Sequence, residues 1–159
     1  MKKILFIIFI SLSFNSYSQD ISGCDSIPMS NETDAKNAEP CVLKLSEYAL
    51  SEPMTGYSEQ AHYARKVVIA WMGETPDYTF SLNSNIMKIF KGDNILLFGT
   101  YTCCMANAAL TQEGDFSKHG LGLFVEYVTN PKNQVKQSKS IKILIKDWKK
   151  GEIDKYIEE

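Results

Sequence analysis

Apolar residues recur at intervals of three and four along most of the chain from residue 40 onward, which is the spacing of amphipathic helices. This pattern predicts helices over residues 41–50, 58–72, 81–91, 94–112, 116–129 and 138–149, followed by a short one over 153–157. Turns rich in Gly, Pro, Asn and Asp separate the segments, and no two segments alternate as paired strands would. We therefore expect an all-α domain, built as an irregular bundle of about six helices.

Stacked helical hairpins of the tetratricopeptide kind are a variant of this architecture, because helices alternate with short turns. Such arrays repeat about every 34 residues. The Trp, Gly and Pro residues of this chain are not spaced at that interval. The irregular bundle is therefore the preferred prediction.

The segment 94–112 differs from the other segments because apolar or small residues cover most of its circumference. We expect it to be the central, buried helix, with its alanines allowing close approach of its neighbours. The next segment, 116–129, contains Gly120 and Gly122. Each costs about 1 kcal/mol relative to Ala inside a helix, unless close packing requires it.

The N-terminus has the three parts of a secretory signal peptide. Lys2 and Lys3 precede an apolar run that ends in polar residues, with small residues at Ser16 and Ser18. The run is shorter than the roughly 20 apolar residues of a membrane span, and no later segment reaches that length. We therefore predict a signal peptide over residues 1–18, cleavage before Gln19, and an exported protein that is periplasmic or extracellular.

Two segments follow the signal peptide. Residues 19–39 are polar and lack apolar periodicity, which predicts a flexible leader. Residues 40–159 form the single helical domain. A lipid anchor at Cys24 is the less favoured alternative to plain cleavage, because polar residues separate its lipobox-like Ile21-Ser22-Gly23 from the apolar run.

The charge balance excludes one class of partner. The chain has 17 Lys and Arg against 19 Asp and Glu, so removal of Lys2 and Lys3 leaves a net charge of −4. A nucleic-acid-binding protein needs a dense basic patch, so we expect no nucleic-acid partner. The basic bias from Lys132 to Lys150 is interpreted as a solvated helix face.

Four cysteines remain after cleavage, and export would place them where disulfides persist. Adjacent residues such as Cys103 and Cys104 rarely bond to each other. The preferred bond joins Cys41 to Cys104, closing a loop of about sixty residues and stabilising the fold by about 4 kcal/mol. The alternative is that one or both are buried, reduced side chains. A catalytic thiol is less favoured than either, since the chain has no CxxC motif.

No motif of catalysis, metal binding or cofactor binding is present. His62 and His119 lie in different predicted helices, without a HExxH pattern, and GxSxG, P-loop, GxGxxG and CxxCH sequences are missing. We therefore assign no catalytic, metal-binding or cofactor-binding residue and lean toward a protein that is not an enzyme.

The most distinctive local sequence is the linker that follows Trp71. It sets a turn between the aromatic residues Tyr78 and Phe80. Trp71, Tyr78 and Phe80 are a candidate ligand or partner surface, although a loop packed on the core is the preferred interpretation because aromatic residues dominate ordinary cores.

Several of these features together resemble a group of small exported helical proteins of Bacteroidota. They are a leader ending in Ser18-Gln19, a helix with Cys41, the run from Trp71 to Leu82, and a helix with Cys104-Met105. The resemblance implies export and a helical fold. It transfers no catalytic or binding residue, because these proteins have no assigned function.

Three functional hypotheses follow. The first is a non-catalytic protein-interaction module of the cell envelope, whose protein partner the sequence does not identify. A sharper version is an immunity-type inhibitor of a toxin, with acidic or aromatic residues clustered on one face. The third is a small-ligand carrier or enzyme with a pocket near Trp71, Tyr78 and Tyr101.

Overall fold

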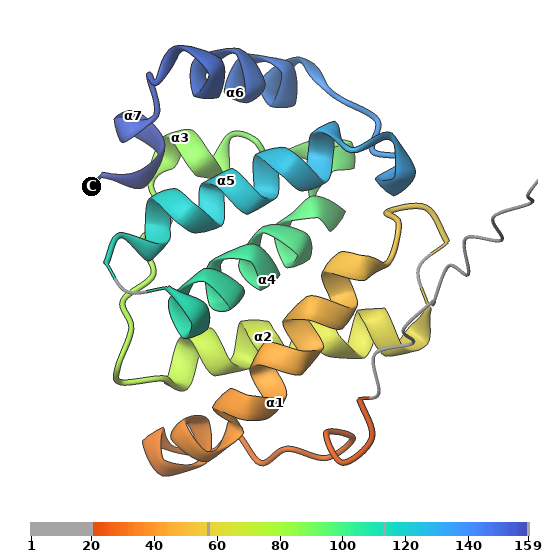
Figure 1. Ribbon diagram of the computed structural model, residues 1–159, viewed down its shortest axis with the longest axis vertical. Helices are drawn as coiled ribbons and strands as arrows, with labels where there is room; N and C mark the ends of the chain where they lie inside the picture. Colours follow the sequence, from red (N-terminus) through yellow and green to blue (C-terminus); the bar gives the residue numbers. More distant parts are fainter. Residues whose placement is uncertain (1–20, 57, 113, 159) are drawn as a thin grey trace, which may run out of the picture.

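The computed structural model describes residues 21–56, 58–112 and 114–158, and Figure 1 shows its arrangement. Every regular element in these ranges is a helix, and the ranges contain no β-strand. The predicted all-α bundle is confirmed. The longer helices are α1 (Glu32–Ser51), α2 (Glu59–Glu74), α4 (Leu96–Thr111), α5 (Phe116–Thr129) and α6 (Lys139–Lys150). The shorter elements are α3 (Ser84–Met87), η1 (Gly92–Asn94), η2 (Pro131–Asn133) and α7 (Asp154–Ile157).

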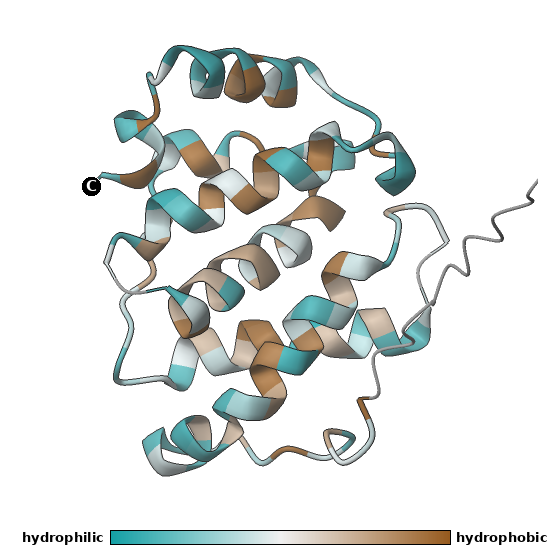
Figure 2. Cartoon of the chain, viewed as in Figure 1, coloured by the Kyte–Doolittle hydropathy of each residue, from teal (hydrophilic) through white to brown (hydrophobic). Residues whose placement is uncertain are grey.

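Helix α4 lies at the centre of the bundle, as its sequence predicts. It packs against α1 and α2 on one side and against α5 on the other, while α6 lies beyond α5 at the edge of the fold (Figure 1). Most of the helix is apolar or small, in contrast to the strongly two-sided α6 (Figure 2). A helix that is apolar all round is stable only when other elements cover it on every side.

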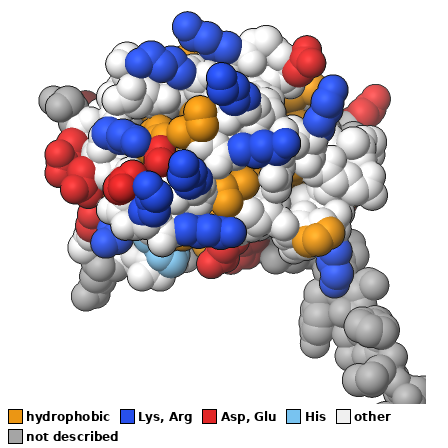
Figure 3. Space-filling model, turned by 90° about the horizontal axis from the view of Figure 1, so that it is seen from above, with side chains coloured by type: hydrophobic (Ala, Val, Ile, Leu, Met, Phe, Trp, Pro, Cys, Tyr) orange, Lys and Arg blue, Asp and Glu red, His pale blue; other side chains and the backbone are white. Residues whose placement is uncertain are grey.

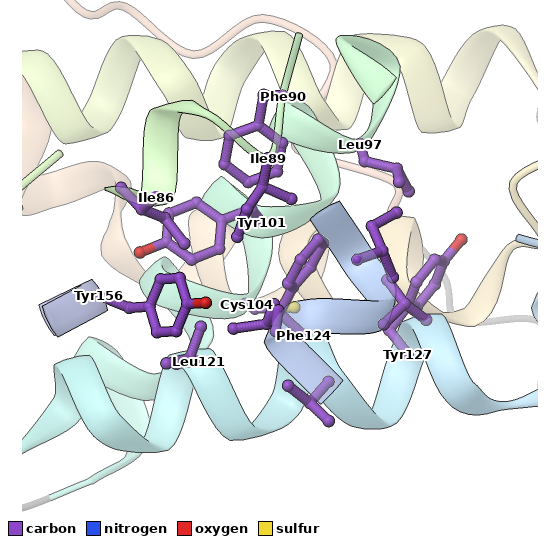
Figure 4. Close-up of a cluster of buried hydrophobic side chains, with 14 of the residues drawn as sticks. Ile86, Ile89, Phe90, Leu97, Tyr101, Cys104, Leu121, Phe124, Tyr127 and Tyr156 are labelled. Carbon is purple, nitrogen blue, oxygen red and sulfur yellow. The ribbon is translucent and has the colours of Figure 1, made fainter. Parts of the chain in front are cut away.

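Two clusters of buried side chains make up the core, and α4 contributes to both. Cys103 and Ala106 join the cluster formed with α1 and α2. Tyr101 joins the cluster formed with α3, α5, α6 and α7, where its ring lies 5.3 Å from that of Phe90 and 5.5 Å from that of Phe124 (Figure 4). Burial of these apolar surfaces on both sides of one helix is the main stabilising contribution to the bundle.

The first helix begins earlier than its sequence pattern predicts. The Asn31 side chain accepts a hydrogen bond from the Asp34 amide at 2.9 Å and caps α1, which continues through Pro40. The predicted flexible leader is therefore wrong for residues 32–39. The periodicity was hidden because the inward positions in this stretch are the small residues Ala35 and Ala38, which are both buried.

The two glycines of α5 are explained by close packing. A Cβ atom on Gly120 would come within 3.0 Å of the Met105 Cα atom in α4, and one on Gly122 within 2.9 Å of the Trp148 ring in α6. The two glycines lower the helix propensity of α5, but they allow α4 and α6 to approach its backbone closely.

The predicted helix over 81–91 is divided in the structure. Asn83 caps the single turn of α3, and the chain then turns through η1, where Gly92 has a positive φ of 60°.

The predicted signal peptide lies outside the described residues. None of the described helices is long and apolar enough to cross a membrane.

Candidate functional site

The cysteine pairing differs from the prediction. Cys41 forms a disulfide with Cys24, with Cα atoms 5.6 Å apart, so the predicted bond between Cys41 and Cys104 is wrong. The bond attaches the segment before α1 to the first half of that helix. The Tyr63 hydroxyl of α2 donates a hydrogen bond to the Cys24 carbonyl at 2.8 Å and holds the same segment from the other side. A lipid anchor on Cys24 would need the sulfur that this disulfide uses.

The two remaining cysteines are free and buried in α4. Burial raises the pKa of Cys103 to about 12 and raises that of Cys104 well above its usual range, although the nearby Arg65 guanidinium acts in the opposite direction. A thiol with such a pKa is almost entirely neutral near pH 7 and is a poor nucleophile. The structure therefore favours the alternative in which both residues are buried, reduced side chains.

Arg65 is a buried cation between α1, α2 and α4, with only 5% of its surface exposed. Its guanidinium donates hydrogen bonds to the carbonyls of Ala61 in its own helix and Ala49 in the last turn of α1, both at 3.1 Å. The C-terminal carbonyls of a helix otherwise lack donors, so Arg65 caps α1. Its side chain also covers Gly99, where a Cβ atom would come within 3.0 Å of the Arg65 Cδ atom.

The aromatic linker packs on the core. Trp71 is fully buried, and its indole nitrogen donates a hydrogen bond to the Ala35 carbonyl at 3.1 Å. The rings of Tyr78 and Phe80 lie 5.7 and 5.8 Å from the Trp71 ring, and Phe116 of α5 contacts both. These distances are typical of aromatic packing, so the candidate surface is mainly a contact between the linker and the helices.

The third residue of the hypothetical pocket lies elsewhere. Tyr101 is in the other core cluster, packed between Phe90 and Phe124, while Trp71 and Tyr78 belong to the cluster around α1 and α2. The structure does not bring the three residues together.

His62 and His119 are both exposed, and no group of three or more His, Cys, Asp or Glu among the described residues is arranged to hold a metal ion.

The strongest clustering of charge is on α6. Residues 132–150 contain seven lysines and one acidic residue, Asp147, which is buried. Spacings of three, four, three and one place five of these lysines along one exposed side of the helix: Lys139, Lys142, Lys146, Lys149 and Lys150. We call this row the lysine stripe. In the view from above, Lys and Arg side chains surround exposed apolar side chains (Figure 3).

Beside the stripe lie three adjoining cavities of about 250, 470 and 240 Å³, and the second of them separates α6 from the α3–η1 segment. The first two share Asp93, Asn94 and Ser138, and the last two share Lys88, Ser140 and Ile143, so the three follow one another along the surface. We call the three together the α6 groove. Its first part has apolar walls, its middle part is lined by lysines, and it ends at Tyr156 of α7.

Comparison of the chain with protein-family models, with curated proteins and with solved structures gives no match.

Sequence reasoning recognised the basic bias of residues 132–150 but not the groove. The lysines are visible in the sequence, and their spacing places them on one side of a helix. The opposite wall of the groove comes from residues 85–97, about fifty positions earlier in the chain, and only the packed fold brings the two walls together.

Proposed function

We propose that the protein is a non-catalytic protein-interaction module of the cell envelope, and that α6 and its surroundings bind an acidic partner protein. The observation that carries this proposal is the lysine stripe. Lysines three and four positions apart on one helix side repel one another, which destabilises a helix by about 0.2–0.5 kcal/mol per pair. Carboxylates of a partner would relieve that repulsion.

The rest of the charge distribution supports this orientation. Residues 21–80 carry nine Asp and Glu against four Lys and Arg, whereas residues 132–150 carry seven lysines against one acidic residue. An acidic partner is therefore repelled by the α1 and α2 end of the molecule and attracted to α6. Such asymmetry accelerates association in the correct orientation.

Most of the stripe is available for binding, because four of its five lysines form no ion pair with another described residue. Among the described residues, the only ion pair that involves the stripe joins Lys150 to Glu152 at 3.5 Å, on an exposed part of the surface. The one acidic residue inside α6, Asp147, points toward Lys155 and Tyr156 instead.

The test compares two variants of equal charge. In one, Lys142, Lys146 and Lys149 of α6 are changed to Gln; in the other, the exposed Lys36, Lys44 and Lys66 of α1 and α2 are changed. Each immobilised protein is incubated with envelope extract, and carbodiimide then links lysines to carboxylates in contact. At about 0.5 kcal/mol per lysine, the α6 variant should retain its partner roughly tenfold less well.

The control variant should retain the partner as well as the unchanged protein does. Higher salt should weaken retention of the partner by both proteins. Cross-links should join stripe lysines to Asp or Glu of one protein. Equal retention by the two variants, or cross-links that avoid α6, would contradict the proposal.

A further inference from the structure

We infer that the α6 groove binds an extended acidic peptide segment that carries one bulky apolar side chain. This inference rests on the proposed function and specifies how the acidic partner is recognised. The apolar side chain occupies the first part of the groove, and the acidic residues follow the lysines of its middle part.

The first part of the groove exposes apolar surface. Met54, Leu96, Leu97 and Val135 line it, and Leu96 is 56% exposed. The preceding residue in the chain, Ile95, is 57% exposed. Side chains of this size are rarely left so exposed without a partner when they gather at one concave site. An apolar anchor from a bound peptide would cover them.

The backbone beside this apolar part offers hydrogen-bonding groups that no other described backbone group occupies. Residues 135–137 connect η2 to α6 without regular structure. Within the described chain, no backbone–backbone hydrogen bond involves their amides or carbonyls. A peptide that lies alongside them in an extended conformation can pair with these groups, as peptides do when they add to an open strand edge.

The middle of the groove selects for negative charge. Lys88 and Lys91 approach from the α3–η1 wall and Lys139 from α6, whereas Asp93 is the only acidic residue that lines this part. Lys136 adds a further positive charge at the boundary with the apolar part. None of the ion pairs between described residues involves these four lysines.

Hydrogen bonds hold the two walls in place before any ligand binds. Asn94, which is buried, donates to the Ile89 carbonyl at 2.8 Å on one wall and to the Ser138 hydroxyl at 2.7 Å on the other. At the apolar end, the Met54 amide donates to the Asn133 carbonyl at 2.8 Å, and Thr55 donates to the Gln134 side chain at 2.5 Å. A preformed groove loses little freedom on binding, which favours affinity.

The observations favour a peptide over an anionic membrane surface. A helix that lies in a membrane interface must offer its apolar side to the lipid. Most of the apolar side of α6 is instead buried against the core, where Ile141 and Leu144 have no exposed surface, and Ile143 is its one largely exposed apolar side chain. The first part of the groove is also concave, whereas a membrane is flat on this scale.

The experiment selects random dodecapeptides, displayed on phage, against the purified protein, and measures the affinity of the selected peptides by fluorescence polarisation. We expect enrichment of peptides that combine several Asp or Glu with one Leu, Ile, Met or Phe. Two groove variants, Leu96→Ser and Lys139→Gln, alter exposed residues. Leu96→Ser should weaken binding by about tenfold, and Lys139→Gln by about threefold. Of these two variants, only Lys139→Gln should also reduce the salt dependence of the affinity for the peptides.

Two control variants on α2, Ile69→Ser and Lys66→Gln, make the same chemical changes at exposed sites outside the groove and should leave affinity within about twofold. The inference is overturned if no acidic and apolar consensus emerges, or if the groove variants bind the peptides as well as the controls do. It is also overturned if phosphatidylglycerol vesicles compete with the peptides and bind the Leu96→Ser variant undiminished.

The two proposals fail in different ways. If the triple variant of the lysine stripe loses its envelope partner but Leu96→Ser retains it, the interaction function stands and the groove is not its site. If both variants retain the partner, the proposed function fails as well.

Discussion

The backbone of Met105 lies directly against Gly120, so that a Cβ atom on residue 120 would come within 3.0 Å of the Met105 Cα atom and 2.6 Å of its Sδ atom. The sulfur is the end of a flexible side chain and can move. The Cα atom belongs to the central helix α4, which cannot move without disturbing both core clusters. The separation of α4 and α5 therefore depends on the missing side chain at residue 120.

We predict that Gly120→Ala destabilises the protein by up to about 2 kcal/mol, because an overpacking cost of about 1–3 kcal/mol exceeds the gain of about 1 kcal/mol in helix propensity. Gly73 in α2 is the matched control: it is helical, and a Cβ atom there would have no neighbour within 4 Å. Gly73→Ala should stabilise the protein by up to about 1 kcal/mol. Urea unfolding of both variants measures whether each substitution lowers or raises the free energy of unfolding. An increase for Gly120→Ala would contradict the packing argument.

The disulfide gives a second prediction. A bond between residues 17 positions apart is expected to contribute about 3 kcal/mol through the unfolded chain. Reduction, or the Cys24→Ser variant, should lower the free energy of unfolding by about that amount and release residues 21–31 to proteolysis. In the Cys103→Ser variant, a peptide map made without reduction should still contain the peptide in which Cys24 is linked to Cys41. A map in which Cys41 is linked to Cys104 would contradict the pairing.

The bundle was predictable to the extent that its helices bury large apolar residues. The bounds predicted for α5 match the structure, because its inward residues include large ones such as Phe124 and Tyr127, and the Asn130-Pro131 pair ends the helix. The start of α1 was not predictable in the same way. Its inward residues at positions 35 and 38 are alanines, and Pro40 inside a helix is normally read as a first turn.

The disulfide and the groove could not be predicted for a different reason. With four cysteines, the sequence allows three full pairings, and only the folded position of residues 21–31 brings Cys24 to Cys41. The groove likewise depends on the division of the predicted 81–91 helix into α3 and η1, which places lysines of that segment opposite α6. Long-range packing decides both features.

The buried thiols make stability depend on alkaline pH. Unfolded cysteines ionise near pH 8.5, whereas burial raises the pKa of Cys103 to about 12 and raises that of Cys104 as well. Because the folded pKa is the higher one, the stabilising contribution is fully present below about pH 8.5 and is lost as the pH rises. At pH 9.5 the free energy of unfolding should be lower by about 1 kcal/mol from Cys103, and the raised pKa of Cys104 should lower it further.

The measurement is urea unfolding between pH 7.5 and 9.5, with the Cys103→Ala, Cys104→Ala double variant as control. The control should show a flatter pH dependence even if its overall stability is lower. In the native protein neither thiol should react with Ellman's reagent, and both should react after unfolding. Rapid reaction of native thiols at pH 7.5 would be inconsistent with their burial.

The contact between α7 and α6 should lose stability at acid pH, whereas the buried thiols lose it at alkaline pH. The Tyr156 hydroxyl donates to the Asp147 carboxylate at 2.7 Å, and the Lys155 ammonium lies 2.9 Å from the same oxygen. The hydrogen bonds from Lys155 and Tyr156 lower the pKa of Asp147, so its stabilising contribution is present above about pH 4 and is lost as the pH falls through the folded pKa.

We therefore predict that Tyr156→Phe costs about 1.5–3 kcal/mol at pH 7, as expected for a hydrogen bond to a charged group, and less at acid pH, once the Asp147 carboxylate becomes protonated. Tyr48→Phe is the control, because the Tyr48 hydroxyl pairs with the uncharged Ser58 hydroxyl at 3.1 Å. It should cost about 1 kcal/mol at pH 7 and at acid pH. Urea unfolding of both variants at pH 7, 5 and 3 provides the comparison. If the cost of Tyr156→Phe did not fall at any acid pH at which the protein stays folded, the carboxylate would not be what holds α7 in place.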